Sequence, residues 1–178
     1  MASIYMRIDG FTSEGSATAK DIKTKEGKKK GWFALNSFAW NGSRSVAMDI
    51  GNMTNADSGK MTFSKVRVSK EVDGASEDLL SYLFAPGEKG KTVEIAFTKP
   101  SRLGKGKEVY FQMKLEEARL VNYSVSGIKG SQPLERMSLS YTVIHQKHSY
   151  EVSGGDLKDG GLVTYNLKDG AMTSGSKK

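Results

Sequence analysis

The residues that could do chemistry in this chain are few and poorly grouped. His145 and His148 are its two histidines, and their His-x-x-His spacing is one that metal sites use. On an extended strand, however, an odd spacing points the two rings to opposite faces, whereas one metal ion needs converging ligands. We therefore interpret them as surface or edge histidines and expect no metal site.

Three other patterns could suggest an enzyme. Glu116 and Glu117 have the residue type of an acid/base pair, but adjacent residues on a strand diverge. Residues 104–107, Gly-Lys-Gly-Lys, lack the spacing of a phosphate-binding loop and precede a strand pattern instead of a helix. The Gly-x-Ser-x-Gly turn of serine hydrolases does not occur. We expect no enzymatic activity, no catalytic residue and no cofactor.

Composition places the chain among globular proteins of one domain. Its 178 residues are 37% hydrophobic and 26% charged, and its net charge of +7 comes from 27 basic and 20 acidic residues. This balance is too mixed for a dedicated nucleic-acid-binding tail. The absence of cysteine excludes disulfides and thiolate metal sites.

The N-terminus and the apolar runs bear on location. Arg7 and Asp9 lie where a secretory signal would carry its apolar stretch. The longest nearly apolar run, residues 79–85, is far shorter than the roughly 18 residues of a membrane-spanning helix. We expect a chain that is made in the cytoplasm, without a signal peptide and without membrane insertion.

Period-two alternation predicts about eight strands. They are expected at residues 4–9, 32–41, 60–68, 91–98, 108–117, 119–125, 134–150 and 162–167. Residues 32–41 are apolar on both faces, which is typical of a strand near the centre of the core. A change of parity predicts a bulge or bend near Ser64 and Lys65. Residues 76–85 form the one convincing helix, with Asp73 or Ser76 as its N-cap and Pro86 after its end.

Two long segments interrupt the alternation. Residues 12–31 are polar, and we interpret them as a loop; a lysine cluster between Lys20 and Lys30 has no aromatic side chains among it, and its role stays open. Residues 42–59 combine turn residues with scattered apolar ones, which indicates a projecting hairpin or loop.

About eight strands and one helix in one domain imply a closed barrel or a two-sheet sandwich. A basic β-barrel that binds nucleic acid or carbohydrate remains an alternative function at this point.

Several stretches, in order along the chain, resemble one known family. They are residues 4–10 with 14–16, residues 38–40, residues 61–65 with the helix around Leu79 and Leu80, and the closing segments 115–121, 134–141 and 160–167. Together with the chain length and the lone helix, they are similar to the haemolysin co-regulated protein (Hcp) family, the inner-tube subunits of the bacterial type VI secretion system. The chain departs from the common pattern in its lysine-rich first loop, in residues 42–59 and in a Lys/Ser tail.

The resemblance implies a tight β-barrel of two sheets with one helix, in a single domain over residues 1–173, followed by a flexible tail at 174–178. It also implies hexameric rings that stack into a tube, are expelled by a contractile sheath and carry effectors in the lumen. The partners would be further copies of the chain, sheath and spike proteins and effector proteins, but not nucleic acid. The protein would leave the cytoplasm through the type VI system itself.

The resemblance also assigns candidate contact residues. The long loop after Trp40 corresponds to the one that meets the neighbouring ring. The stacking candidates in it are Arg44, Met48, Met53 and Asn55, and the candidate for a lumen-facing position is Asn41. For the two methionines, ordinary packing within the loop is the alternative.

Overall fold

Strands dominate the part of the chain that the structure describes, as the alternation predicts, and one helix accompanies them there. The computed structural model describes residues 3–12, 22–24, 27–29, 31–45, 47–48, 55–56, 61–104 and 106–174. The long strands in these ranges are β1 (Ser3–Ile8), β10 (Val66–Glu71), β11 (Lys91–Pro100), β12 (Lys107–Ser126), β13 (Leu134–Ser140), β14 (Val143–Glu151) and β15 (Leu157–Asn166). The short ones are β2 (Ile22–Thr24), β3 (Gly27–Lys29), β4 (Phe33–Leu35), β5 (Ser37–Ala39), β6 (Gly42–Arg44), β7 (Ala47–Met48), β8 (Asn55–Ala56), β9 (Met61–Phe63) and β16 (Ala171–Met172).

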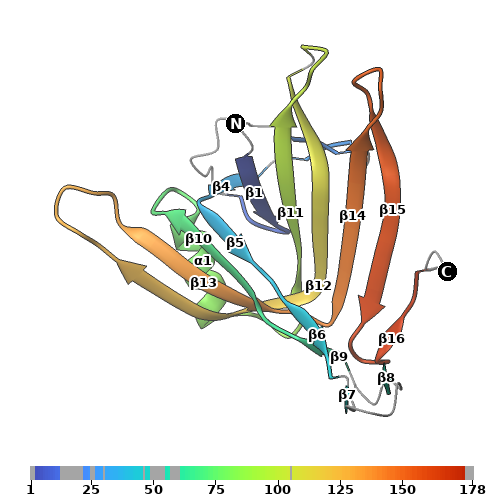
Figure 1. The fold of residues 1–178 in the computed structure, drawn as a ribbon. Coiled ribbons are helices and arrows are strands. Elements are labelled where there is room, and N and C mark those ends of the chain that lie inside the picture. Colours follow the sequence, from blue (N-terminus) through green and yellow to red (C-terminus); the bar gives the residue numbers. More distant parts are fainter. Residues whose placement is uncertain are drawn as a thin grey trace.

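Strand β12 belongs to two sheets, which gives the molecule the angular shape seen in Figure 1. Its first half pairs with β11 and β14 in a large sheet ordered β16-β15-β14-β12-β11-β1-β4. Its second half pairs with β13, and this smaller sheet continues through β10 to β5. The two predicted strands at 108–117 and 119–125 are therefore one long strand that changes sheets.

A second bent segment closes the pairings into a barrel. Strand β4 pairs with β1, and after Asn36 the chain continues as β5, which pairs with β10. The backbone N–H of Asn36 donates to Ser69 O at 2.7 Å and holds the bend. The pairings thus run from β1 through β11, β12, β13, β10 and the β5–β4 segment back to β1. Strands β14, β15 and β16 extend the large sheet beyond this barrel, and we call these three strands the wing. The predicted two-sheet barrel is confirmed, but residues 32–41 form two short strands instead of a single central one.

The bend in β12 lies at Glu117, whose φ is 52°, the one positive value for a non-glycine residue within the described ranges. Gly90 passes very close to it. A Cβ atom on Gly90 would lie 2.4 Å from the carbonyl carbon of Glu117, so only glycine fits at this position.

The main core lies between the two sheets and the helix. Its fully buried side chains include Met6, Phe33, Leu79, Ile95 and Leu139. A smaller cluster of Tyr5, Ile22, Trp32 and Ala96 covers the other face of β1 and β11. Residues 12–31 are therefore not entirely a loop, because β2 and β3 pair as a hairpin. Ile22 anchors this hairpin in the smaller cluster. A single apolar residue produces no hydrophobic periodicity, so the sequence did not predict these strands.

The helix α1 (Ser76–Phe84) matches the predicted one. It buries Leu79 and Tyr82, and the Tyr82 hydroxyl donates to the carbonyl oxygen of Ala118 in β12. Ala75 occupies the N-cap position, so neither predicted cap is correct. Asp73 Oδ1 instead accepts from the Ala75 N–H at 2.9 Å and braces the preceding turn. Among the described residues, no helix is long and apolar enough to cross a membrane.

A buried charged cluster joins β10, β13 and the turn before α1. Lys70 Nζ lies 2.7 Å from Glu135 Oε2 and 2.7 Å from Asp73 Oδ1, and the side chains of Lys70 and Glu135 are completely buried. The Tyr123 hydroxyl donates to Glu135 Oε1 at 2.6 Å. Every charge in this cluster therefore has a close partner, as buried charges require.

Two predicted segments lie partly outside the described residues. The tail at 174–178 is described only at Ser174, whose hydroxyl accepts from the Thr164 N–H at 2.7 Å. Within the lysine cluster at 20–30, the described residues are those of β2 and β3.

Candidate functional site

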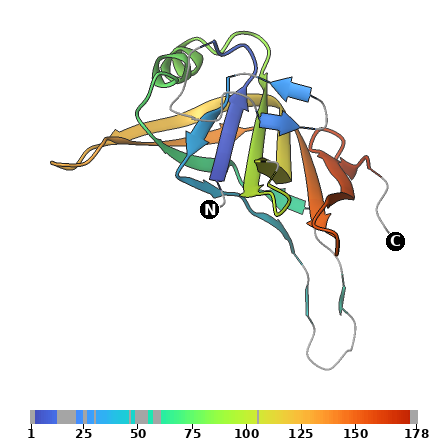
Figure 2. The same cartoon turned by 90° about the horizontal axis from the view of Figure 1, so that it is seen from above.

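The segment after Trp40 forms a hairpin that projects from the barrel (Figure 2). At its base, β6 pairs with β9 through Gly42–Phe63, Ser43–Thr62 and Arg44–Met61. Farther out, β7 pairs with β8 through Ala47–Ala56 and Met48–Asn55. The projecting hairpin expected for residues 42–59 is therefore present. Strands β9 and β10 are separated at Ser64 and Lys65, as the change of parity predicts.

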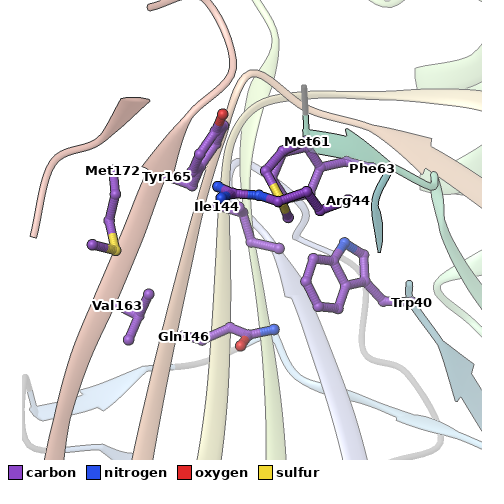
Figure 3. A pocket seen from close by; sticks show the side chains of 9 residues that line it. All are labelled: Trp40, Arg44, Met61, Phe63, Ile144, Gln146, Val163, Tyr165 and Met172. Atoms are coloured by element: carbon purple, nitrogen blue, oxygen red, sulfur yellow. The ribbon is translucent and has the colours of Figure 1, made fainter. Parts of the chain in front are cut away.

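A pocket of about 310 Å³ opens where this hairpin meets the wing. One wall comes from the hairpin and the residues next to it, and the other from β14, β15 and β16. The lining residues are Trp40, Arg44, Met61, Phe63, Ile144, Gln146, Val163, Tyr165 and Met172 (Figure 3). Their predominantly apolar character suits an apolar group better than an ion.

Three aromatic rings are in contact within the lining of the pocket. The rings of Trp40 and Phe63 stack with centroids 6.2 Å apart, and those of Phe63 and Tyr165 lie 4.7 Å apart. Gly42 makes room for this packing, because a Cβ atom there would come within 3.3 Å of the Trp40 ring. The three rings join the hairpin to the wing.

A hydrogen-bond chain fixes the orientation of Trp40. Its indole N–H donates to the Tyr141 hydroxyl at 2.7 Å, and that hydroxyl donates to the carbonyl oxygen of Ser64 at 2.9 Å. Burial raises the pKa of Tyr141, although the hydrogen bond from Trp40 opposes part of this effect. The phenol therefore stays protonated at neutral pH and can both donate and accept.

We expect Tyr141→Phe to lower the free energy of unfolding by about 1–3 kcal/mol, because it leaves the Trp40 N–H and the Ser64 carbonyl without their partner. Urea denaturation followed by tryptophan fluorescence measures the change. Tyr150 is half exposed, so Tyr150→Phe is a matched control that should change stability by less than about 0.5 kcal/mol. Equal effects of the two variants would contradict a structural role for the Tyr141 hydroxyl.

Arg44 is the one charged residue among the described residues that line the pocket. Its Nε donates to Met61 Sδ at 3.4 Å, and both side chains are among those that line the pocket in Figure 3. A thioether is a weak acceptor, so this hydrogen bond is by itself a weak one. The pocket therefore combines apolar and aromatic side chains with one cation.

The other predicted contact residues are distributed along the hairpin. Met48 and Asn55 are paired across it in β7 and β8, and Met53 lies outside the described residues. Asn41 is exposed at the base, where its backbone N–H donates to Ser64 Oγ and its carbonyl accepts from the Ser64 N–H, both at 2.9 Å. The sequence analysis missed the wing side of the pocket, because Val163, Tyr165 and Met172 are about 100 residues or more away in the chain.

The histidines do not converge. His145 Nδ1 lies 2.9 Å from Thr164 Oγ1, whereas the His148 ring packs against Phe111 with centroids 4.9 Å apart. Burial would raise the pKa of Glu116, but Lys114 and His145 beside it hold this pKa below its usual value. Within the described ranges, no three His, Asp or Glu side chains are grouped as a metal site.

Fold and site together define a small, mainly β barrel protein with a projecting hairpin. A sequence profile of the family described as "Type VI secretion system effector, Hcp" matches residues 5–148. The chain therefore belongs to the Hcp family of type VI secretion system tube proteins, as the resemblance indicated. A comparison with curated protein sequences finds no match.

Solved structures show the same fold. A structure described as a type six secretion system protein superposes with a TM-score of 0.79 at 20% identity and covers 97% of this chain and 100% of its own. Hcp1 from Salmonella typhimurium gives a TM-score of 0.66 at 18% identity, covering 96% and 98%. Hcp3 from Pseudomonas aeruginosa gives 0.56 at 22% identity, covering 93% and 98%. Family membership favours a tube protein over a barrel that binds nucleic acid or carbohydrate.

Proposed function

We propose that this protein is a structural subunit that assembles into hexameric rings, and that the rings stack into the tube of a type VI secretion system. The projecting hairpin is the observation that carries this proposal. A two-stranded hairpin is at best marginally stable in water by itself, and β7 and β8 extend beyond the sheets that could support them (Figure 2). Contact with a neighbouring ring would supply the missing surface.

In this proposal, the hairpin is the stacking element. Arg44 contacts the next ring at the base of the hairpin, and Met48, Met53 and Asn55 contact it farther out. Asn41 faces the lumen. The apolar pocket beside Arg44 accepts a side chain of the neighbouring subunit and holds the hairpin in its projecting position.

The tube is the vehicle for secretion. A contractile sheath expels it together with a spike, and effector proteins travel in its lumen. The subunit is made in the cytoplasm and needs no signal peptide, because it leaves the cell as part of the tube.

Removing the outer hairpin tests the stacking role directly. Since Arg44 and Met61 are paired, residues 45–60 can be replaced by Asn-Gly, which forms a two-residue turn between paired strand positions. We expect this variant to form hexameric rings by size-exclusion chromatography with light scattering, but to form no tubes by electron microscopy and not to be secreted. Normal tubes and normal export would show that the hairpin is not the stacking element.

A charge reversal provides a finer test at the base of the hairpin. Arg44→Glu should reduce tube formation less than the truncation does, because it changes one contact and leaves the rest of the hairpin in place. Lys158→Glu reverses an exposed charge on β15 and serves as the matched control, with tube yield expected to equal that of the wild type. Equal tube yields for the Arg44 and Lys158 variants would remove Arg44 from the interface.

A further inference from the structure

The pocket between the hairpin and the wing has the size and the lining of a small-molecule site (Figure 3). Its volume of about 310 Å³ lies at the lower end of the range of ligand pockets, roughly 300–1,000 Å³. Two of its apolar side chains are open to solvent, since Val163 is 53% and Met172 46% exposed. A ligand that covers them removes apolar surface from water, which favours binding.

The pocket is built on ordered elements. Trp40 is held by the hydrogen bond from its indole N–H to the Tyr141 hydroxyl, and the wing residues lie on paired strands of the large sheet. Arg44 and Met61 are paired across the base of the hairpin. A preformed site loses little conformational freedom on binding, so it can hold even a small ligand.

The charge in the pocket selects the charge of the ligand. Arg44 is a cation, and none of the described residues that line the pocket is a carboxylate. Its Nε donates to Met61 Sδ, which is a weaker acceptor than a carboxylate oxygen, so an anionic ligand gains a charge-assisted hydrogen bond there. The rings of Trp40 and Phe63 could attract a cation, but Arg44 would repel it.

The aromatic side chains select the body of the ligand. The apolar lining requires that the anion carry an apolar group, and a further ring gains favourable contacts with the rings of Trp40, Phe63 and Tyr165 beyond the area that it buries. We infer that the pocket binds a small aromatic monocarboxylate, with its rings against these side chains and Val163 and its carboxylate on Arg44. This inference goes beyond the proposed function, in which the same pocket receives a neighbouring subunit's side chain in the tube, because the ligand binds the unstacked chain.

Methionine methyl groups report on this pocket directly. Met61 and Met172 line it, whereas Met6 and Met137 are buried in the main core. In the full-length protein with carbon-13-labelled methionine methyls, titration with 2-naphthoate should shift the Met61 and Met172 signals together and leave those of Met6 and Met137 in place. The expected dissociation constant is about 0.1–1 mM, as is usual for a ligand of this size. Unchanged Met61 and Met172 signals well above this concentration would overturn the inference.

Two matched pairs of variants test the two features of the pocket. Val163→Glu places a negative charge in the pocket and should weaken binding of 2-naphthoate at least tenfold. Leu162→Glu is its control, because Leu162 is 50% exposed on the same strand and faces the other side of the sheet, so the dissociation constant should change less than about twofold. Arg44→Met should also weaken binding at least tenfold, whereas Arg102→Met removes an exposed arginine outside the pocket and should have no effect.

The neutral analogue 2-naphthamide separates recognition of the anion from apolar binding alone. It should bind the wild type at least tenfold more weakly than 2-naphthoate, and Arg44→Met should change its dissociation constant less than about twofold. Equal affinities for the two compounds, or equal effects of Arg44→Met and Arg102→Met, would overturn the inference. A wild type that forms no rings would contradict the proposed function, and the methyl shifts would decide this inference in either case.

Discussion

Replacing Lys70 by methionine should lower the free energy of unfolding by about 3–5 kcal/mol, because the substitution leaves a buried carboxylate without its counter-charge. Lys70 Nζ contacts both Glu135 and Asp73 at 2.7 Å, and solvent reaches neither Lys70 nor Glu135. The Tyr123 hydroxyl bonds the remaining oxygen of Glu135, so little can rearrange to solvate the charge. Urea denaturation at fixed protein concentration measures the loss.

Two comparisons separate burial from charge alone. Arg7 and Asp9 also form an ion pair at 2.8 Å, but the Asp9 side chain is 62% exposed, so Asp9→Asn should cost less than about 1 kcal/mol. Glu135→Gln added to Lys70→Met removes one of the two carboxylates that lose Lys70, the fully buried one, so the double variant should be more stable than Lys70→Met alone. A loss below 1 kcal/mol for Lys70→Met would contradict the buried pair.

This cluster shows what a sequence can and cannot predict. Alternation from Val66 and Val68 places Lys70 on the core face of its strand, so parity alone marks it as unusual. Its partner, Glu135, lies 65 residues farther along the chain, directly opposite in the pairing of β10 with β13. Such a partner follows from the register of two distant strands, which local periodicity does not contain.

At the candidate site too, local features could be predicted from the sequence and contacts between distant strands could not. The hairpin is a local structure, so turn residues and scattered apolar positions between Gly42 and Gly59 were sufficient to predict it. The pocket is not local, because Tyr165 reaches Phe63 only after β14 and β15 have folded onto β12. Residues 134–150 show a related error: the alternating pattern continues through Tyr141, although the chain turns there and begins a new strand at Val143.

The bend that joins the two sheets is the other place where a single atom should have a large effect. We expect Gly90→Ala to lower the free energy of unfolding by about 3 kcal/mol or more, since the new methyl would lie 2.4–2.7 Å from three backbone atoms of Glu117. Those atoms cannot move aside easily, because Glu117 already has a φ of 52° and β12 is held by pairing on both sides of it. Gly154→Ala is the matched control: the position has open space around it and should change stability by less than about 1 kcal/mol. Thermal unfolding should show a decrease of about 6–12 °C for the Gly90 variant. A melting temperature equal to that of the Gly154 variant would show that the backbone can yield at this bend, and that the close approach does not fix the angle between the sheets.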